Sequence, residues 1–290
     1  MKRRSRFLVS FGLALTLCWT IDASFGQGQK GETRKYTLGN TEYQEIASKI
    51  TQEHYELIVA LPYTYAQDTA KRYPVVYFCD GFYDFPLFWM IYADQIYDKT
   101  ISECILVGFS YKGEHLDYGK LRTRDYTPIS SGPGTGGGPE FLKVVEREFI
   151  PFVEKHYRVD PGFRALGGSS LGGLFVLYTM FSRPELFNAY MAVSPAVVGG
   201  NGWLFNLEEQ FHSQHKALPV SLYMTGAEKE FADQPAFFEG IKFFGEVLKK
   251  RDYERFRYQF RVLDGAYHAG SKPEGFSRAM QFIFAPLVTK

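Results

Sequence analysis

The stretch Gly167–Leu174 reads GGSSLGGL, with two adjacent serines among four glycines. An apolar stretch with strand character precedes it, and a helical stretch follows. In the pattern G-x-S-x-G the serine lies on a sharp strand-to-helix turn, and the outer residues are small because the backbone folds tightly past them. Gly168–Gly172 fits this pattern with Ser170 at its centre, whereas centring on Ser169 would put Leu171 where glycine is needed. We therefore predict that Ser170 presents its hydroxyl above the edge of a sheet.

Strand-like and helical stretches alternate along most of the chain. The apolar strands are continuous rather than alternating with polar residues, which is typical of a parallel sheet covered by helices on both faces. The expected strands are two within Thr41–Leu61, then Tyr73–Cys79, Cys104–Ser110, Arg164–Gly167, Tyr190–Val193, Val220–Thr225 and Arg257–Leu263. The expected helices are Leu87–Tyr97, one that Pro139 opens, Leu171–Phe181, Pro235–Lys250 and Glu274–Phe284. The sequence thus predicts one α/β domain over residues 36–290.

The N-terminus has the pattern of a secretory signal peptide. Four basic residues within the first six precede an apolar run, Phe7–Ile21, and small residues follow up to Gly26. The run is too short and wrongly flanked for a comfortable membrane span, so we expect cleavage near Gly26–Gln27, with a membrane-anchored stem as the alternative. The prediction is a signal peptide over residues 1–26, a polar leader over 27–35, and a periplasmic or secreted protein without stable membrane insertion.

The charge and the cysteine content limit the classes of binding partner and predict whether the cysteines form a disulfide. The chain holds 33 Lys and Arg against 32 Asp and Glu; the first 26 residues contain four of the former and one of the latter, leaving 29 against 31. No basic block remains, which argues against nucleic acid or an anionic membrane as the main partner. Cys79 and Cys104 lie at opposite ends of neighbouring predicted strands. That separation is too large for a disulfide, so we expect two buried thiols.

Residues 111–138 form an insert that interrupts the alternation of strands and helices. The first part of the insert, YKGEHLDYGKLRTRD, is charged, and its last part, within SSGPGTGGGP, is rich in glycine. A connection this long is usually functional or disordered. The glycines are no dinucleotide-binding loop, because no strand leads directly into them. The insert leaves the carboxyl end of a predicted strand, where ligands bind in open parallel sheets. We expect a mobile rim that forms one wall of a pocket, with disorder as the alternative.

A serine hydroxyl is a weak nucleophile and needs an adjacent base. Of the six histidines, only His268 follows the last predicted strand in a short loop, GAYHAG. The order serine, acid, histidine along the chain is that of an α/β-hydrolase. The acid is expected just after strand Val220–Thr225, where Glu228 is the first choice, Glu230 the near alternative, and Asp233 more distant. The sequence therefore predicts a triad of serine, histidine and an acid.

Two backbone N–H groups are expected to form an oxyanion hole. Leu171, immediately after the nucleophile, supplies one of them, and Phe82, in the tight turn Asp80-Gly81-Phe82, supplies the other. No metal or organic cofactor is expected. His212 and His215 are spaced as two metal ligands could be, but no acid lies at a matching spacing, so we expect them on a solvated helix face.

Five stretches together resemble the putative esterase family, the esterase D-like branch of the α/β-hydrolases. That branch includes siderophore (enterochelin) esterases, feruloyl and acetyl-xylan esterases, and mycolyltransferases. The stretches are YPVVYFCDG, RTRDYTP, GGSSLGGLFVLY, AVSP and GAYHAGSKPEGFSRAMQFIF, and the resemblance runs from about residue 40 to the C-terminus. It implies a serine hydrolase with Ser170 as nucleophile, His268 as general base and a glutamate after Gly226. Ser169 replaces a histidine often found in the family, and GGNGW (199–203) replaces an aromatic pair, which leaves the substrate class open.

We therefore expect an exported carboxylic-ester hydrolase that forms an acyl-enzyme and acts on a small-molecule or glycan-linked ester. Arg124 and Trp203 are the expected substrate contacts. Arg122 and Arg124 could both meet an anionic substrate group, and an ion pair with Asp125 that pins the insert is the alternative. Two other functions stay open: an acyltransferase with the same triad, and a binding protein that keeps the fold without turnover.

Overall fold

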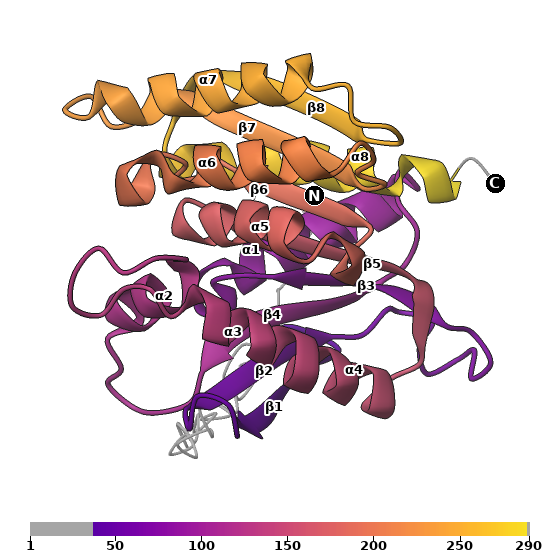
Figure 1. Cartoon of the computed structure of the whole chain (residues 1–290). Helices are drawn as coiled ribbons and strands as arrows, with labels where there is room; N and C mark the ends of the chain where they lie inside the picture. Colours follow the sequence, from indigo (N-terminus) through magenta and orange to yellow (C-terminus); the bar gives the residue numbers. More distant parts are fainter. Residues whose placement is uncertain (1–36, 289–290) are drawn as a thin grey trace, which may run out of the picture. The chain divides into compact units, whose positions relative to one another are not determined.

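The computed structural model describes residues 37–288. These residues form a twisted sheet with helices packed on it. The predicted signal peptide (1–26) and the predicted polar leader (27–35) both lie outside the described residues. From Leu38 onward the chain forms one compact unit, in which eight strands follow the order β1-β2-β4-β3-β5-β6-β7-β8 (Figure 1). The strands are β1 (Thr41–Ala47), β2 (His54–Ala60), β3 (Tyr73–Phe78), β4 (Ile105–Tyr111), β5 (Val159–Ser169), β6 (Ala189–Val193), β7 (Ser221–Lys229) and β8 (Arg257–Tyr267).

The sheet is mostly parallel. Strand β2 pairs antiparallel with β1 and with β4, and every other neighbouring pair from β4 to β8 is parallel. The mostly parallel sheet predicted from the continuous apolar strands is confirmed. Because parallel strands end at the same edge of a sheet, the residues that follow β3, β5, β6, β7 and β8 meet at one edge.

Helices cover both faces of this sheet (Figure 1). They are α1 (Gly81–Tyr97), α2 (Tyr118–Tyr126), α3 (Gly138–Val144), α4 (Ile150–His156), α5 (Leu171–Ser182), α6 (Gly199–Gln214), α7 (Pro235–Lys250) and α8 (Lys272–Val288). Helices α1 and α8 pack on one face, and α3, α4, α5, α6 and α7 contribute to the core on the other. A π-helical turn, Val145–Phe149, joins α3 to α4. Pro151 follows it and has no N–H to continue a regular α-helical ladder.

The strands bury side chains on both sides. On β3, Tyr73, Val75 and Tyr77 point into one apolar cluster, and Val76 and Phe78 point into the other. Successive residues of a strand face opposite sides, so burial of all five explains why the strand reads as a continuous apolar run. The sheet is therefore a rigid support for whatever its carboxyl edge carries.

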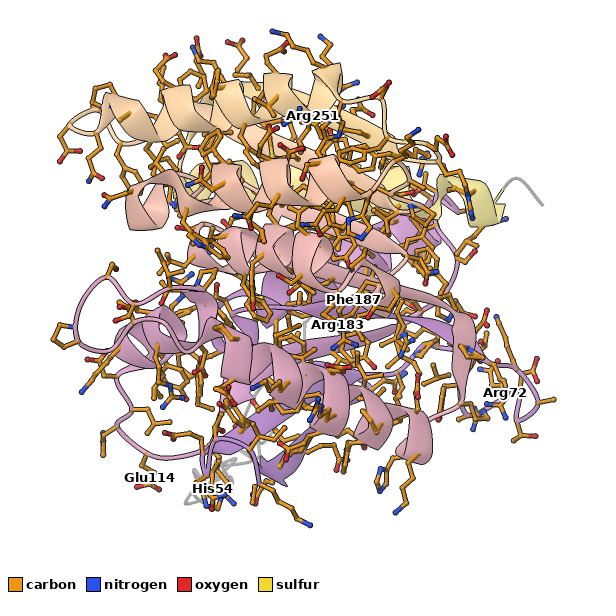
Figure 2. The ribbon with its side chains drawn as sticks, in the orientation of Figure 1. His54, Arg72, Glu114, Arg183, Phe187 and Arg251 are labelled. Carbon is orange, nitrogen blue, oxygen red and sulfur yellow. The ribbon has the colours of Figure 1, made fainter. Side chains whose placement is uncertain are left out.

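Ion pairs also tie the helices of one face together. Arg183, labelled in Figure 2, follows α5 and binds Glu146 through both of its terminal nitrogens at 2.5 and 2.6 Å. Arg251, also labelled there, follows α7 and binds Glu208 of α6 at 2.8 and 3.0 Å. Paired Arg–carboxylate contacts of this kind fix orientation as well as distance.

The structure differs from the sequence prediction chiefly in the insert. The segment expected as a mobile rim contains helix α2, which has no apolar periodicity and was therefore not predicted. The Asp117 carboxylate caps this helix by accepting from the Lys120 N–H at 3.0 Å. Helix α6 was also missed, because Gly200, Asn201 and Gly202 all have positive φ values and interrupt its first turns. Polar, kinked helices of this kind carry little periodic signal.

The expected free thiols are confirmed. Cys79 and Cys104 are both buried and unpaired, and β3 and β4 are parallel neighbours, so the two residues lie at opposite ends of the pair. Burial raises the pKa of both thiols well above the ordinary value. Within residues 37–288, no helix is both long enough and apolar enough to cross a membrane.

Candidate active site

Ser170 lies on the turn between β5 and α5, in a conformation unusual for a residue other than glycine. Its φ is 57° and its ψ is −119°. The turn is held by backbone hydrogen bonds: the Ser170 N–H donates to Val193 at 3.1 Å, and the Ser170 carbonyl accepts from Leu174 and Ala196 at 2.9 and 3.0 Å. Such strain persists only where the surroundings over-determine it, and it is concentrated at functional sites. The neighbouring Ser169 is buried and its hydroxyl has no hydrogen-bond partner.

The glycines around Ser170 are required by close backbone contacts. A Cβ on Gly168 would lie 2.5 Å from the Gly172 carbonyl carbon, and a Cβ on Gly172 would lie 2.9 Å from the Cys79 Cβ. A side chain at position 168 would displace backbone, and one at position 172 would displace the Cys79 side chain. The structure thus gives the spacing in Gly168–Gly172 the physical reason that the sequence predicted.

His268 follows β8 directly, as predicted, and its acid partner is Glu230. The His268 Nδ1 lies 2.5 Å from the Glu230 Oε2, and the other Glu230 oxygen accepts from the Ala227 N–H at 2.8 Å. The Glu230 side chain is 1% exposed. Burial raises the pKa of Glu230, but hydrogen bonds from His268, Ser194 and the Ala227 N–H outweigh it and hold the pKa below its ordinary value. A buried, ionised carboxylate therefore faces the imidazole.

The expectation that Glu228 faces His268 is wrong. The Glu228 carboxylate is exposed and accepts instead from the Gly265 N–H at 2.7 Å. Strand β7 runs on to Lys229, four residues beyond the Thr225 at which the predicted strand ended. The turn after the strand is shifted accordingly, and Glu230, the near alternative, is the residue that lies against the imidazole.

Ser170 and His268 are brought to the same edge by the ends of β5, β6, β7 and β8. Ser194 comes directly after Val193, which binds the Ser170 N–H. The Ser194 hydroxyl contacts the Ser271 hydroxyl at 3.0 Å, and Ser271 donates to the His268 carbonyl at 2.7 Å. No hydrogen bond joins the Ser170 hydroxyl to His268 in the described part of the chain, a contact that hydrolases without substrate often make loosely.

Three supporting residues were not found from the sequence. Ser194 and Ser271 link the turns that carry Ser170 and His268, and the Phe231 ring lies 4.3 Å from the His268 ring, centre to centre. The AVSP run contains Ser194 and was noted only as part of the family resemblance. Phe231 follows Glu230 directly, so its place depends on the same turn that the sequence left undecided.

The two predicted oxyanion donors lie in the first turns of two helices. Leu171 is the first residue of α5, and Phe82 is the second residue of α1. The first N–H groups of a helix have no partner within it, so both are available to an oxyanion. Asp80, directly before α1, has a left-handed backbone conformation with φ 58°. Its side chain forms an ion pair with Arg122 of the insert, at 2.6 Å between Nε and Oδ1.

A cavity of about 230 Å³ lies beside the nucleophile turn. Its walls include Leu171 and Leu174 of α5, Trp203 of α6, and Ile129 and Thr135 of the insert. The insert lines this cavity, as expected. Trp203 lines it too, and its contact with a substrate stays a prediction. Most of the lining is apolar, so the cavity suits an uncharged part of a ligand.

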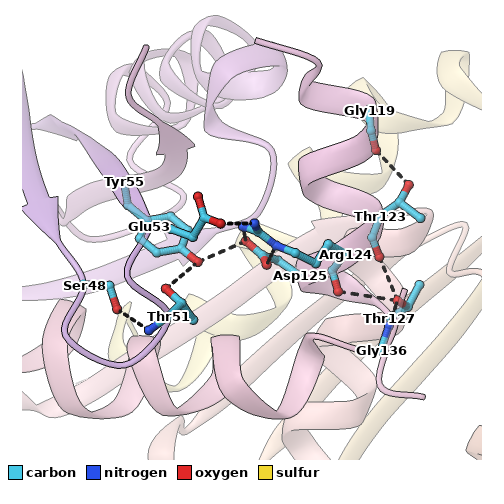
Figure 3. Close-up of polar contacts among 10 residues, drawn as sticks. All are labelled: Ser48, Thr51, Glu53, Tyr55, Gly119, Thr123, Arg124, Asp125, Thr127 and Gly136. Atoms are coloured by element: carbon cyan, nitrogen blue, oxygen red, sulfur yellow. Dashed lines mark hydrogen bonds and ion pairs between the residues drawn. The ribbon is translucent and has the colours of Figure 1, made fainter. Parts of the chain in front are cut away.

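Arg124 does not line this cavity. Its guanidinium binds Asp125 at 2.7 Å and Glu53 at 2.5 Å, and the Tyr55 hydroxyl donates to the other Asp125 oxygen at 3.2 Å (Figure 3). The expectation of a substrate contact is therefore not met, because two carboxylates already occupy the guanidinium. The alternative that the sequence left open, an ion pair with Asp125 that pins the insert, is what the structure contains.

His212 and His215, which were expected on a solvated helix face, lie at the C-terminal end of α6 and directly after it. His212 lies on α6 and packs edge-on against Tyr253, and His215 stacks on Phe211. Within residues 37–288, no group of three or more His, Cys, Asp or Glu side chains is placed to hold a metal ion.

Residues 48–255 match the sequence model of the family described as Putative esterase. The chain belongs to the putative esterase family. One relative is the ferri-bacillibactin esterase of Bacillus subtilis (strain 168), which is 25% identical over 275 residues, covering 88% of this chain and 93% of that protein. The apo-salmochelin esterase of Escherichia coli O6:H1 is 28% identical over 194 residues, covering 61% of this chain and 59% of that protein.

Two solved structures with the same fold illustrate the likeness. The BES protein from Bacillus cereus has a TM-score of 0.77 and 26% identity, covering 87% of this chain and 99% of its own. An IroE-like serine hydrolase from Shewanella oneidensis has a TM-score of 0.75 and 23% identity, covering 84% of this chain and 80% of its own. The predicted α/β-hydrolase fold is confirmed, and the esterase is a carboxylic-ester hydrolase.

Proposed function

We propose that this esterase cleaves its substrate through an acyl-enzyme on Ser170. His268 takes the proton from the Ser170 hydroxyl as that oxygen attacks the ester carbonyl, and later returns a proton to the leaving alcohol. Water then attacks the acyl-enzyme with His268 again as base, and the acid is released. The N–H groups of Leu171 and Phe82 stabilise the oxyanion that forms in each half of the reaction.

The contact between His268 and Glu230 is the observation that carries this proposal. A charged carboxylate at 2.5 Å from Nδ1 fixes the tautomer that leaves Nε2 free to accept a proton. It also stabilises the imidazolium that forms in the transition state. Together with the strained turn at Ser170, it gives the nucleophile, base and orienting acid that acyl transfer needs.

Labelling with a fluorophosphonate probe, followed by peptide mapping, tests the mechanism directly. We expect a single stoichiometric label on Ser170 that abolishes ester turnover. Absence of labelling in a protein that still hydrolyses esters would rule out a serine nucleophile. Release of a transferred acyl product when a second alcohol is added would instead identify an acyltransferase with the same triad.

The substrate is proposed to be a small-molecule ester. The relatives named above include esterases of ferri-bacillibactin and apo-salmochelin, so siderophore esters are the first natural compounds to test. The apolar cavity beside Leu171 accommodates an uncharged group of the substrate. A screen of siderophore, feruloyl, acetyl-sugar and simple acyl esters, ranked by kcat/KM, identifies the class.

The enzyme is further proposed to act outside the cytoplasm. This rests on the basic start, the apolar run Phe7–Ile21 and the small residues up to Gly26. N-terminal sequencing of the protein from the periplasm or medium should find a new terminus near Gln27. An uncleaved protein that stays with the membrane would favour the anchored stem.

A further inference from the structure

The turn after β3 is an atypical start for a helix. Asp80 stands at the N-cap position of α1, where an aspartate ordinarily has an extended backbone and its carboxylate accepts from the second or third N–H of the helix. Here Asp80 has φ 58° and ψ 35°, and its carboxylate accepts from neither of those groups. The second N–H belongs to Phe82, which is the expected oxyanion donor.

Arg122 explains where the Asp80 carboxylate goes instead. The guanidinium of Arg122 binds both carboxylate oxygens, with Nε at 2.6 Å from Oδ1 and Nη2 at 2.9 Å from Oδ2. The two side chains are 19% and 6% exposed, so the pair is largely shielded from water. A bidentate pair fixes the carboxylate in orientation as well as in position. Burial alone would lower the pKa of Arg122, but its bonds with Asp80 raise it above the ordinary value, which keeps the cation charged.

The same helix of the insert also holds the backbone of the turn. The Asp80 N–H donates to the Tyr126 hydroxyl at 3.0 Å, and Tyr126 is one helical turn beyond Arg122. The Asp80 carbonyl accepts from Tyr83 and Asp84 at 2.9 Å, which starts α1. The backbone N–H and carbonyl of Asp80 both have hydrogen-bond partners, whereas the Phe82 N–H has none among the described residues.

The Asp80 turn also packs directly on α5, the helix that begins with the other expected oxyanion donor, Leu171. A Cβ on Gly172 would lie 3.1 Å from the Asp80 Oδ2 and 2.9 Å from the Cys79 Cβ. Gly172 follows Leu171, so displacement of the Asp80 carboxylate would disturb the start of α5 as well as that of α1.

We propose that Arg122 is a positioning residue that keeps the oxyanion hole open by holding the Asp80 carboxylate away from the Phe82 N–H. This rests on the proposed chemistry at Ser170. Without the guanidinium, the turn relaxes to an ordinary N-cap, in which the carboxylate accepts from Phe82 and repels the developing oxyanion. Arg122 acts through Asp80 and needs no contact with the substrate.

The decisive experiment compares Arg122→Met with the double variant Arg122→Met/Asp80→Gly on a neutral ester. One oxyanion donor is worth on the order of 10²- to 10³-fold in kcat. We expect Arg122→Met to lower kcat by about 10- to 100-fold with little change in KM. The affinity for a trifluoromethyl ketone, whose adduct carries an oxyanion, should fall by the same factor. In the double variant, glycine accepts the left-handed conformation and no carboxylate remains, so most of kcat should return.

Arg124→Met is the matched control. It removes a guanidinium from the same helix and breaks a paired contact with Asp125, but it leaves the Asp80 turn intact. We expect a lower thermal unfolding temperature with kcat within about twofold of wild type. An Arg124→Met variant with the same loss of kcat as Arg122→Met would show that general loosening of the insert, rather than release of Asp80, is responsible.

Three further results would overturn the proposal. One is an unchanged kcat in folded Arg122→Met. Another is an equal loss in the double variant, which would mean that the cation itself is needed. The third is a loss confined to anionic esters, which would make Arg122 a substrate contact.

A structural readout keeps this proposal separate from the proposed function. In a crystal structure of Arg122→Met, Asp80 should leave its left-handed conformation and accept from the Phe82 N–H. If Asp80 keeps its conformation, the positioning role fails, whatever the activity of the wild type. If wild type neither hydrolyses esters nor takes a fluorophosphonate label, the proposed function fails, whatever the conformation of Asp80.

Discussion

The carboxyl edge of β5 to β8 and the insert at residues 111–138 are held in place in different ways. At the edge, backbone contacts dominate: the Ser170 N–H donates to the Val193 carbonyl, and the Ser194 N–H donates to the Thr225 carbonyl. In the insert, side chains dominate: Arg122 binds Asp80, and Arg124 binds Glu53. The edge is thus an extension of the sheet, whereas the position of the insert depends on a few ion pairs. Substitutions in the insert that keep the pair of Arg122 with Asp80 can therefore change the pocket while the sheet and its edge stay unchanged.

Ser170→Ala should have the largest effect, because it removes the nucleophile that the edge presents. We expect ester turnover to fall on the order of 10³-fold or more, with the remaining rate due to the oxyanion hole and substrate binding. Ser169→Ala should keep most of the activity, since the Ser169 hydroxyl is buried and has no hydrogen-bond partner. Steady-state kinetics on a simple acyl ester measures both. A comparable loss in two folded variants would contradict the assignment.

The two glutamates of the acid turn give the next largest contrast. Glu230→Gln keeps the shape of the side chain but cannot stabilise the imidazolium form of His268, so we expect kcat to fall by on the order of 10²- to 10⁴-fold. Glu228→Gln should leave kcat within about twofold, because the carboxylate is exposed and binds the Gly265 N–H rather than His268. The control is the unfolding midpoint of each variant. A larger loss of kcat in Glu228→Gln than in Glu230→Gln would assign Glu228 as the acid of the triad.

The edge was largely predictable from the sequence. The glycine pattern around Ser170 and the place of His268 after the last strand both follow from chain order and turn chemistry, which are local properties. Helix α7 (Pro235–Lys250) was predicted to the residue, because a proline opens it and a regular apolar face marks its length. The parallel sheet was predictable because strands such as β3 are buried on both faces and therefore read as continuous apolar runs.

The acid and the insert were not predictable to the same degree. Choosing between Glu228 and Glu230 requires knowing where β7 ends, and the pairing of β7 with β8 extends that strand through Lys229. Arg124 was expected at the substrate because its partner Glu53 is 71 residues earlier in the chain. Helix α2 is stabilised by a cap and by long-range ion pairs, none of which has a period in the sequence. These features depend on tertiary contacts that no local pattern reports.

Ile129→Ala tests whether the insert determines substrate choice. The side chain lines the cavity beside Leu171, so its truncation enlarges the space for the substrate. We expect kcat/KM for a bulkier acyl ester to rise relative to that for acetate by up to about tenfold, while labelling of Ser170 by a small fluorophosphonate is unchanged. Leu116→Ala, in the insert but not in the cavity wall, is the control. An unchanged substrate profile would mean that the cavity does not hold the acyl group.

The smallest expected effect concerns acid stability, where one carboxyl group of each region should behave oppositely. The pKa of Glu230 at the edge lies below its ordinary 4.5, because the hydrogen bonds from His268, Ser194 and the Ala227 N–H outweigh burial. The pKa of Asp125 in the insert lies above its ordinary 3.8, because burial outweighs the bond with Arg124. A depressed pKa stabilises the folded state above the unfolded value and ceases to do so as pH falls. A raised pKa penalises the folded state at neutral pH, and that penalty disappears as pH falls.

The free energies of unfolding of wild type, Glu230→Gln and Asp125→Asn should therefore diverge on acidification. As pH falls through the ordinary 4.5 of Glu230, the advantage of wild type over Glu230→Gln should shrink, because the unfolded chain takes up a proton at Glu230 before the folded protein does. The difference between wild type and Asp125→Asn should move the other way, in favour of wild type, since native Asp125 takes up its proton before the unfolded chain does. Urea unfolding at several pH values measures both slopes. Slopes of the same sign would show that the ion pair with Arg124, rather than burial, controls Asp125, and the insert would then be held by the same electrostatics as the edge.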